Sequence, residues 1–451
     1  DALEAEEIAI VKRWINEGAK YEPHWSFIAP VRPPLPAVAD TGMITMIHTT
    51  REPARGFVDR IRALEGSLRM HGNGKPEACL IRAGCHVVDE RVVREVERLE
   101  HVRARLHLQH VLDHALEAGR LLTDRFGPFR WQIATTATDA NRFALRVARA
   151  ITGRPKVLVF NGCYHGTVDD IFVTLQDGKT VNRPGLLGQV ADLSLVATAV
   201  EFNDIAAVEA ALKTGEIAAI LAEPVMTNSC MVLPDPGFHK ALRQLARQHG
   251  AVLIIDETHT ISSGLGGYSR MHGLEPDMFV VGKCVAGGMP TAVWGMTDAL
   301  AERYLAVNAG RDSGHSGMGT TLSANPMQFA CLRATLAEVM TEEAYAHMEK
   351  GAARLADGLA EVIANHDAPW HVVRVGARVE FICAPGPLRN GTEAALAHQP
   401  ALEAAIHTAL LNRGCLIAPF HNMMLVSPAT KKRQIDRLIA AFDEILTELL
   451  D

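Results

Sequence analysis

The chain has 451 residues, which is enough for two domains and a large hydrophobic core. Its 45 basic and 52 acidic residues are interspersed and give a formal net charge of −7, which argues against a nucleic-acid partner. The eight cysteines show neither disulfide nor metal-ligand spacing, the apolar runs are too short to span a membrane, and the first residues do not resemble a signal peptide. We therefore expect a cytoplasmic protein without a metal site or a membrane partner.

The first predicted segment, residues 1–115, has an atypical composition. Its second part is rich in Arg and His and poor in Lys and aromatic residues. Two interpretations remain open. Residues 92–122 have helical spacing, so the segment can be a divergent helical region. Alternatively, residues 1–100 come from a misread frame or a joined gene fragment. The spacing of His71, Cys79, Cys85 and His86 matches no common metal site.

A regular pattern begins with a predicted strand at Trp131–Ala134, followed by a helix that opens at Thr135–Asn141. A strand, a tight turn and small hydroxyl residues at a helix start indicate an anion site, because free N–H groups and the helix dipole point at the ligand. The alternative is an ordinary helix cap, since Thr and Asp are good capping residues.

Two buried strands follow. Lys156–Phe160 leads into a loop with Tyr164 and His165, and Ala218–Val225 ends around Glu223. Glu223 is either a carboxylate placed to orient a ligand or a strand-end acid paired with a base. An amphipathic helix is predicted over Phe238–Gly250, because its apolar residues recur at helical spacing and Gly250 stops it.

The next stretch, 251–290, contains two short apolar strands, Val252–Ile255 and Met278–Val281. The first is followed by Asp256 and the second by Gly282 and Lys283. The carboxyl ends of neighbouring parallel strands share one crevice, so a carboxylate and an amine are expected to meet there. A partly desolvated Lys is suited to forming a Schiff base, and an Asp can hold a pyridine nitrogen protonated. The alternative is a buried strand followed by a surface Lys.

These motifs resemble the class III aminotransferases, which are fold-type I enzymes that use pyridoxal 5'-phosphate (PLP). The resemblance covers about residues 119–451. Four groups of residues carry it: Asp256, Glu257, Thr260, Gly282, Lys283, Gly287, Gly288 and Pro290; Thr136–Asn141, with Ala137 in place of Gly and Asp139 in place of Glu; Tyr164, His165, Gly166, Glu223 and Pro224; and Thr321, Ser323, Asn325 and Pro326, with Ala324 in place of Gly.

The resemblance implies an α/β fold. A large PLP-binding domain with a mostly parallel seven-stranded sheet is expected over residues 116–328, and a small α+β domain over residues 329–451. In the small domain we expect a helix from Phe329 to Ala364, strands within Trp370–Ala384, a helix ending at Arg413 and a last helix from Lys431.

The resemblance also assigns roles. Lys283 binds PLP as a Schiff base and moves the proton, Asp256 faces the ring nitrogen, and Glu223 orients cofactor or substrate. Thr136, Ala137 and Thr138 hold the phosphate, Tyr164 stacks on the ring, and Thr258 lies against it. His259 bonds the phenolic oxygen, supports Asp256 or is a satisfied core residue, and His165 is more structural than catalytic. Thr321 reaches the phosphate of a neighbouring subunit, which implies a homodimer.

The expected activity is a transaminase that moves an amino group from an amine or amino acid to a carbonyl acceptor. A glutamate-1-semialdehyde-type aminomutase, a PLP racemase and an inactive PLP-fold protein are the alternatives. Arg374, Arg378 and Arg413 are available to bind a substrate carboxylate, but none lies in a motif that identifies it.

Overall fold

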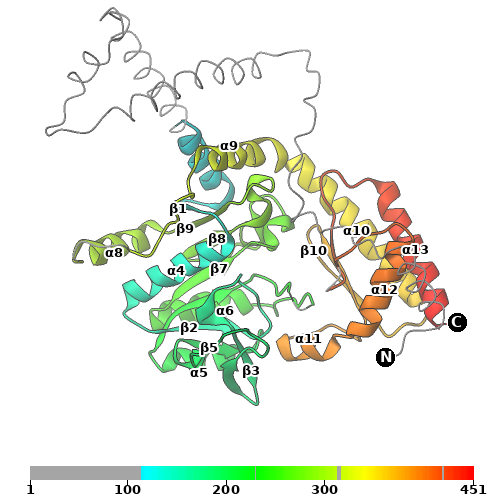
Figure 1. Cartoon of the computed structure of the whole chain (residues 1–451), viewed down its shortest axis with the longest axis horizontal. Coiled ribbons are helices and arrows are strands. Elements are labelled where there is room, and N and C mark those ends of the chain that lie inside the picture. Colours follow the sequence, from blue (N-terminus) through cyan, green and yellow to red (C-terminus); the bar gives the residue numbers. More distant parts are fainter. Residues whose placement is uncertain (1–112, 229, 312–315, 419–420, 451) are drawn as a thin grey trace, which may run out of the picture. The chain divides into compact units, whose positions relative to one another are not determined.

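A seven-stranded sheet organises the computed structural model, which describes residues 113–228, 230–311, 316–418 and 421–450 (Figure 1). Nearly all of the atypical segment 1–115 therefore lies outside the described residues. The strand order is β1-β9-β8-β7-β6-β2-β5. The strands are β1 (Arg130–Ala134), β2 (Lys156–Phe160), β5 (Ala197–Val200), β6 (Ile217–Ala222), β7 (Val252–Asp256), β8 (Met278–Val281) and β9 (Ala292–Met296).

The sheet is mostly parallel, as predicted. β5, β2, β6, β7 and β8 pair in parallel, and β9 runs antiparallel to both β8 and β1. All six residues of β6 are buried, which explains why this strand reads as a continuous apolar run rather than an alternating one. Neither β5 nor β9 was among the strands predicted from the sequence.

Helices cover both faces of the sheet. α4 (Ala137–Thr152) packs across β1, β6, β7, β8 and β9, with α8 (Asp298–Ala309) beside it. α5 (Ile205–Lys213) and α6 (Phe238–His249) contribute to the opposite core. A hairpin of β3 (Val173–Gln176) and β4 (Lys179–Asn182) lies beside β5, and the short α7 (Gly267–His272) follows β7.

The C-terminal part is built on a smaller antiparallel sheet of β10 (His371–Val375), β11 (Arg378–Ile382) and β12 (Met423–Leu425). α10 (Glu342–Asn365), α12 (Pro400–Asn412) and α13 (Lys432–Leu450) form a core with this sheet, and α11 (Gly391–Ala397) precedes α12. Along β11, Val379 and Phe381 enter that core, whereas Ile382 joins the core of the large sheet. One face of β11 therefore packs into the small-domain core, and its other face packs toward the large sheet.

Three predicted elements need correction. The helix expected from Phe329 to Ala364 is two helices, because α9 (Pro326–Ala334) ends in a π-helical turn and Thr341 caps a new helix, α10. The helix ending at Arg413 is also divided, since Pro400 starts α12. The strand 218–225 stops at Ala222, before Pro224, which lacks the N–H that a strand ladder needs.

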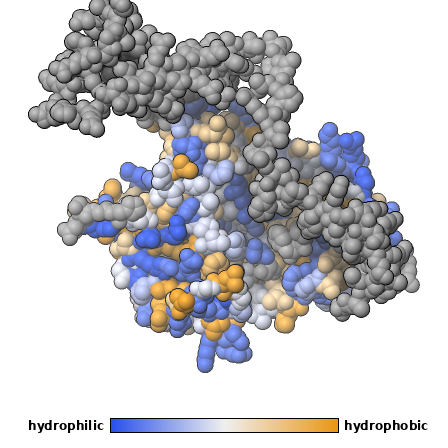
Figure 2. All heavy atoms as spheres, viewed as in Figure 1, coloured by the Kyte–Doolittle hydropathy of each residue, from blue (hydrophilic) through white to orange (hydrophobic). Residues whose placement is uncertain are grey.

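The boundary predicted at 328/329 falls inside α9, and the domain limits stay a prediction. In the part of the chain that the structure describes, no helix is both long and apolar enough to cross a membrane. The face seen in Figure 2 mixes hydrophilic and apolar residues, in keeping with the interspersed charges of the sequence.

Candidate active site

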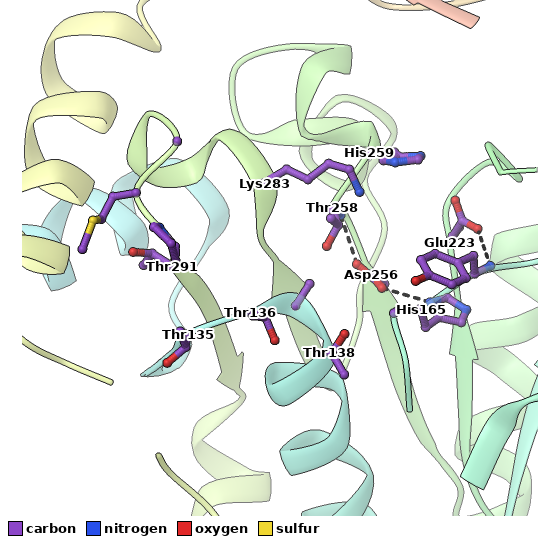
Figure 3. Close-up of a pocket in the computed structure, with 16 residues that line it drawn as sticks. Thr135, Thr136, Thr138, His165, Glu223, Asp256, Thr258, His259, Lys283 and Thr291 are labelled. Atoms are coloured by element: carbon purple, nitrogen blue, oxygen red, sulfur yellow. Dashed lines mark hydrogen bonds and ion pairs between the residues drawn. The ribbon is translucent and has the colours of Figure 1, made fainter. Parts of the chain in front are cut away.

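A cavity of about 300 Å³ lies at the carboxyl edge of the large sheet (Figure 3). The loops that follow β2, β6, β7 and β8 all open into it, because parallel strands end at the same edge. Nine of the ten predicted site residues line it: Thr136, Ala137, Thr138, Tyr164, Glu223, Asp256, Thr258, His259 and Lys283. The tenth, Thr321, is exposed and does not line the cavity within this chain.

Asp256 ends β7 and is only 3% exposed. Its Oδ2 accepts hydrogen bonds from Asn141 Nδ2 (2.8 Å) and His165 Nδ1 (2.9 Å), and its Oδ1 accepts one from Thr258 N (3.0 Å). Burial alone would raise the pKa of Asp256, but these donors outweigh it and lower the pKa to about 2. Asp256 is therefore an ionised carboxylate at neutral pH, and His165 supports it.

Lys283 follows β8 and extends across the cavity toward Thr258 and Asp256 (Figure 3). Its Nζ makes no hydrogen bond or ion pair with any described residue. Burial lowers the pKa of Lys283, and the nearby charge of Arg378 lowers it further against the opposing effect of Asp256. A lowered pKa enlarges the neutral fraction of the amine, which is the nucleophilic form.

The start of α4 forms the opposite end of the cavity. Thr136 is the N-cap, and its Oγ1 accepts a hydrogen bond from Asp139 N (3.1 Å). The ordinary-cap interpretation is thus correct for this side chain, yet the first amides of the helix still lack intrahelical partners. Anion binding and capping are therefore compatible at this helix start.

The loop after β2 closes on the same helix. Thr138 Oγ1 accepts a hydrogen bond from Thr167 N (3.1 Å). Gly166 has φ +82°, and a Cβ placed on it would lie 2.1 Å from Thr138 Oγ1. No side chain fits there, so the glycine is required for the loop to reach the helix.

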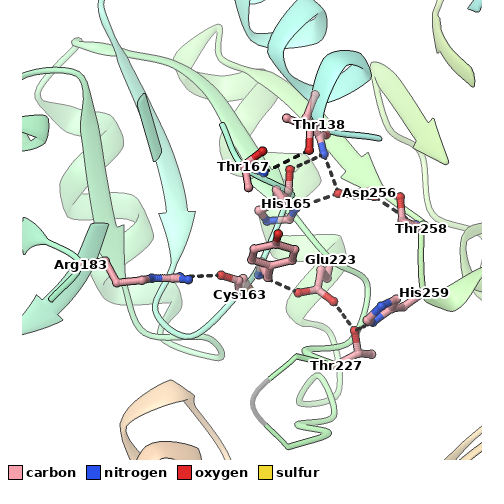
Figure 4. A network of polar contacts seen from close by, with 12 residues as sticks. Thr138, Cys163, His165, Thr167, Arg183, Glu223, Thr227, Asp256, Thr258 and His259 are labelled. Atoms are coloured by element: carbon pink, nitrogen blue, oxygen red, sulfur yellow. Dashed lines mark hydrogen bonds and ion pairs between the residues drawn. The ribbon is translucent and has the colours of Figure 1, made fainter. Parts of the chain in front are cut away.

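A hydrogen-bonded row lies beside Asp256 (Figure 4). Glu223 accepts from Tyr164 N (3.2 Å) and from Thr227 Oγ1, which lies 2.5 Å from His259 Nδ1. Burial raises the pKa of Glu223. Burial, with the nearby charges of Arg378 and Lys283, lowers the pKa of His259 to about 2, so this imidazole is neutral at physiological pH. With Glu223 ionised, Thr227 donates to Glu223 and accepts from His259 Nδ1, which leaves His259 Nε2 as an acceptor.

Sequence reasoning missed three contributors to this region and left a fourth undecided. Asn141 stood inside a quoted motif, but nothing in the motif indicated that it binds Asp256. Thr227 and Thr291 stand in loops without a recognisable pattern. Arg378 was one of three candidate arginines, and only the structure shows that it contacts the loop after β7.

The fold and this cavity define a fold-type I enzyme that depends on PLP. Residues 91–446 match the family model of the class-III aminotransferases, and the chain belongs to that family. This match begins at residue 91. The resemblance recognised from the motifs alone begins later, at about residue 119.

Three known proteins illustrate the similarity. The curated glutamate-1-semialdehyde 2,1-aminomutase of Roseiflexus castenholzii is 34% identical over 339 residues, covering 74% of this chain and 76% of the relative. A glutamate-1-semialdehyde aminomutase from Pseudomonas aeruginosa PAO1, solved in complex with PMP, is 49% identical with a TM-score of 0.73, covering 75% of this chain and 76% of that one. An omega-transaminase from Sphaerobacter thermophilus is 25% identical with a TM-score of 0.68, covering 74% and 78%.

The residues present fit PLP, which the family requires. Thr258 Oγ1 and Thr291 Oγ1 line the cavity and are buried without a hydrogen-bond partner among the described residues. Buried hydroxyls are usually hydrogen-bonded, so these two indicate that the cavity binds a polar ligand. The cavity also offers a helix start for a phosphate, an ionised carboxylate for a ring nitrogen and an amine for an aldehyde. When bound, PLP supplies an electron sink for the carbon that carries the amino group.

Proposed function

We propose that the chain is a transaminase, moving an amino group from an amine or amino acid to a keto acid, ketone or aldehyde. One observation supports it above the others: the Lys283 amine and the buried, ionised Asp256 lie in a single cavity. That pair provides both a proton carrier and a fixed negative charge for a pyridine nitrogen.

The protein's own groups divide the work. Lys283 would attach the cofactor, and its free amine would carry the proton that the reaction moves. Asp256 would hold the ring nitrogen protonated, which would favour withdrawal of electrons into the ring. The helix start at Thr136–Thr138 would hold the phosphate, Tyr164 would lie against the ring, and Glu223 and Thr258 would orient cofactor and substrate. His259 Nε2 is placed to accept a hydrogen bond from the bound molecule rather than to donate one.

Lys283 is suited to proton transfer because its environment lowers its pKa toward the working range. Its Nζ is free of described partners and is therefore not locked in an ion pair. Asp256, in contrast, is fixed by three donors and does not change protonation state near neutral pH. The group that we propose exchanges protons is thus different from the group that stays charged.

A second candidate is a glutamate-1-semialdehyde-type aminomutase, which keeps the amino group within one substrate. The names of the Roseiflexus and Pseudomonas relatives favour it. The same cavity residues serve both reactions, because both need the amine, the ring nitrogen partner and the phosphate site.

We also propose a cytoplasmic homodimer. Thr321 is exposed and outside the cavity of its own chain. Such a position is compatible with a hydroxyl that reaches the phosphate of a partner subunit. The scattered cysteines support a reducing compartment.

The visible spectrum tests the attachment of the cofactor to Lys283. Wild-type protein loaded with PLP is expected to absorb at roughly 410 nm and to lose this absorption band when an amine donor is added. Lys283→Ala removes the band, whereas Lys179→Ala, an exposed lysine on β4, retains it. A band that persists unchanged in Lys283→Ala would rule out this lysine.

Product analysis separates the two candidate reactions. A transaminase releases a carbonyl product from the donor and needs an added carbonyl acceptor for repeated turnover. An aminomutase converts glutamate-1-semialdehyde, without an added acceptor, into an isomer that keeps the amino group and carries a ketone in place of the aldehyde. The second result would replace the transaminase proposal.

A further inference from the structure

A second cavity, of about 560 Å³, lies beside the candidate active site, and none of its residues has a role in the proposed function. The loop after β2 lines this second cavity with Gly162 and the candidate active site with Tyr164. The loop after β6 lines the second cavity with Asn228 and the candidate active site with Glu223 (Figure 4). The two cavities are therefore neighbours that share two of their walls.

A buried carboxyl group lines the second cavity. Glu380 lies on β11 and is only 2% exposed. Its strand neighbours enter the small-domain core, so Glu380 faces the other way, as does Arg378 two residues earlier. Arg378 contacts the candidate active site by donating to His259 O (2.9 Å). Two residues along a strand span about 7 Å, so Glu380 is within the length of one small molecule of the candidate active site.

This carboxyl group has one strong partner among the described residues. Oε2 accepts a hydrogen bond from Met231 N (2.7 Å), whereas the nearest basic group to Oε1, His421 Nδ1, lies 3.9 Å away, beyond hydrogen-bond distance. Burial and the charge of Arg378 lower the pKa of His421, so this imidazole is neutral at physiological pH. Burial raises the pKa of Glu380 to about 8, against the bond from Met231 N and together with the charge of Glu403. The ionised form of Glu380 thus lacks a counter-charge.

The other charged groups around the cavity are engaged elsewhere. Glu403 pairs with His398 (2.8 Å). Arg183 also lines the cavity, but its guanidinium donates to Cys163 O (3.0 Å) and lies 5.9 Å from the centre of the Phe172 ring. A buried carboxylate is costly unless it is paired, so a cation that enters the cavity would find Glu380 as its partner.

A second buried side chain in the same cavity is also poorly paired. Asn422 is 5% exposed, and in the part of the chain that the structure describes its amide makes one hydrogen bond, from Nδ2 to Cys383 Sγ at 4.0 Å. A thiol is a weak acceptor, and buried amides usually have stronger partners. Glu380 and Asn422 belong to different segments, and both indicate that a polar ligand binds here.

We propose that Glu380 binds a second, protonated amino group of the amine donor, so that the preferred donors are diamines. The inference rests on the proposed function and deepens it. An ammonium group brings the missing charge and three N–H donors, which is enough for both Glu380 Oε1 and the amide oxygen of Asn422. A donor that reacts at Lys283 would extend past the two shared loops and place its far end in the second cavity.

The test compares donors that differ only at the far end. Three pairs carry either an ammonium or a methyl group there: 1,3-diaminopropane with butylamine, 1,4-diaminobutane with pentylamine, and 1,5-diaminopentane with hexylamine. Three lengths are used because the donor has to span from Lys283 to Glu380. Loss of the visible band of the PLP-loaded protein is followed against donor concentration, which separates the half-saturation concentration from the limiting rate.

We expect the half-saturation concentration of wild type to be about tenfold or more lower for the diamine in at least one pair. Glu380→Gln keeps an oxygen for Met231 N but removes the charge. It should raise the value for that diamine by about tenfold or more, and change that for the monoamine by less than about threefold. Glu380→Asp keeps the charge on a shorter side chain and should give an intermediate value. The control, Glu349→Gln, removes an acid that pairs with Arg374 outside this cavity, and should change neither donor.

Two results would overturn the proposal: a wild type that prefers no diamine to its monoamine, or a Glu380→Gln variant that weakens both donors of a pair equally, as expected if the carboxyl group only supports Met231 N. If Glu380→Gln does not fold, Glu380→Asp takes its place, and it must weaken the diamine at least about threefold more than the monoamine. A wild-type band that is lost with alanine but with no diamine would overturn this inference and leave the transaminase standing. A band that responds to no donor would refute the transaminase, and the inference with it.

Discussion

Replacing Asp256 by asparagine tests the central electrostatic argument. The pKa of this carboxyl is about 2, against 3.8 for an ordinary aspartate, so its ionised form contributes about 2 kcal/mol to stability at neutral pH. An amide also cannot satisfy the surrounding donors. If its NH₂ faces Asn141 and His165 it meets the amide donor of Asn141, and if it faces Thr258 it meets a backbone N–H. We expect Asp256→Asn to destabilise the fold by about 2–4 kcal/mol at pH 7.

The pH dependence gives this prediction a sign. The folded-state pKa is lower than the unfolded one, so the contribution is complete above about pH 4 and is lost as the pH falls toward about 2. The stability difference between wild type and Asp256→Asn should therefore shrink between these pH values. Urea unfolding of cofactor-free protein measures it without the effect of PLP binding.

Activity provides the second measurement for the same variant. With PLP attached, the rate at which an amine donor removes the visible band should fall by about a hundredfold or more, because the ring nitrogen loses its negative partner. A destabilisation below about 0.5 kcal/mol at pH 7, together with a rate near that of wild type, would refute the reasoning about Asp256.

Three further predictions concern substitutions of single residues. Gly166→Ala places a methyl group against Thr138 at positive φ and should destabilise the protein by ~2–3 kcal/mol in urea unfolding. The control is Gly178→Ala, also at positive φ but with no atom within 4 Å of the added methyl group, which should cost only ~1 kcal/mol. Equal costs for the two variants would contradict the close contact at Gly166. Thr227→Val removes the hydroxyl between Glu223 and His259 and should cost ~1–3 kcal/mol in the same assay, with Thr227→Ser close to wild type; a neutral valine variant would show that the row contributes nothing. Thr321→Ala should weaken PLP binding by about tenfold in a spectroscopic titration while Thr408→Ala does not, and an unchanged affinity would argue against a shared site.

The sequence was most informative where chemistry and local pattern coincide. The strands Lys156–Phe160 and Met278–Val281 were predicted with the bounds that the structure shows, because each is a short apolar run buried on both faces. Asp256 and Lys283 were placed at neighbouring strand ends from the same pattern, and β7 and β8 do pair in parallel. The α10 helix was extended too far back, because the π-helical turn at Thr335–Val339 has no signature in hydrophobic spacing.

The sequence could not predict contacts between residues that are far apart in the chain and meet through a single side chain. Thr227 bonds His259 only because the turns after β6 and β7 bring two loops together, and no spacing rule encodes that meeting. Arg378 meets the same loop from more than a hundred positions away. Local patterns specify elements and strand ends, whereas these pairs depend on how neighbouring loops and the two sheets come together.

These differences divide the residues in and around the cavity into two groups. The residues that recur as family motifs, at the start of α4 and after β7 and β8, are the ones proposed to hold the cofactor, whose chemistry is common to the family. Thr227, His259 and Arg378 stand outside the quoted motifs. Thr227 bridges Glu223 and the neutral imidazole of His259, and Arg378 donates to the backbone oxygen of His259. A cofactor common to many enzymes cannot distinguish their substrates, so discrimination has to come from groups such as these. Exchanging Asp256, which faces the proposed cofactor site, should therefore slow every donor alike.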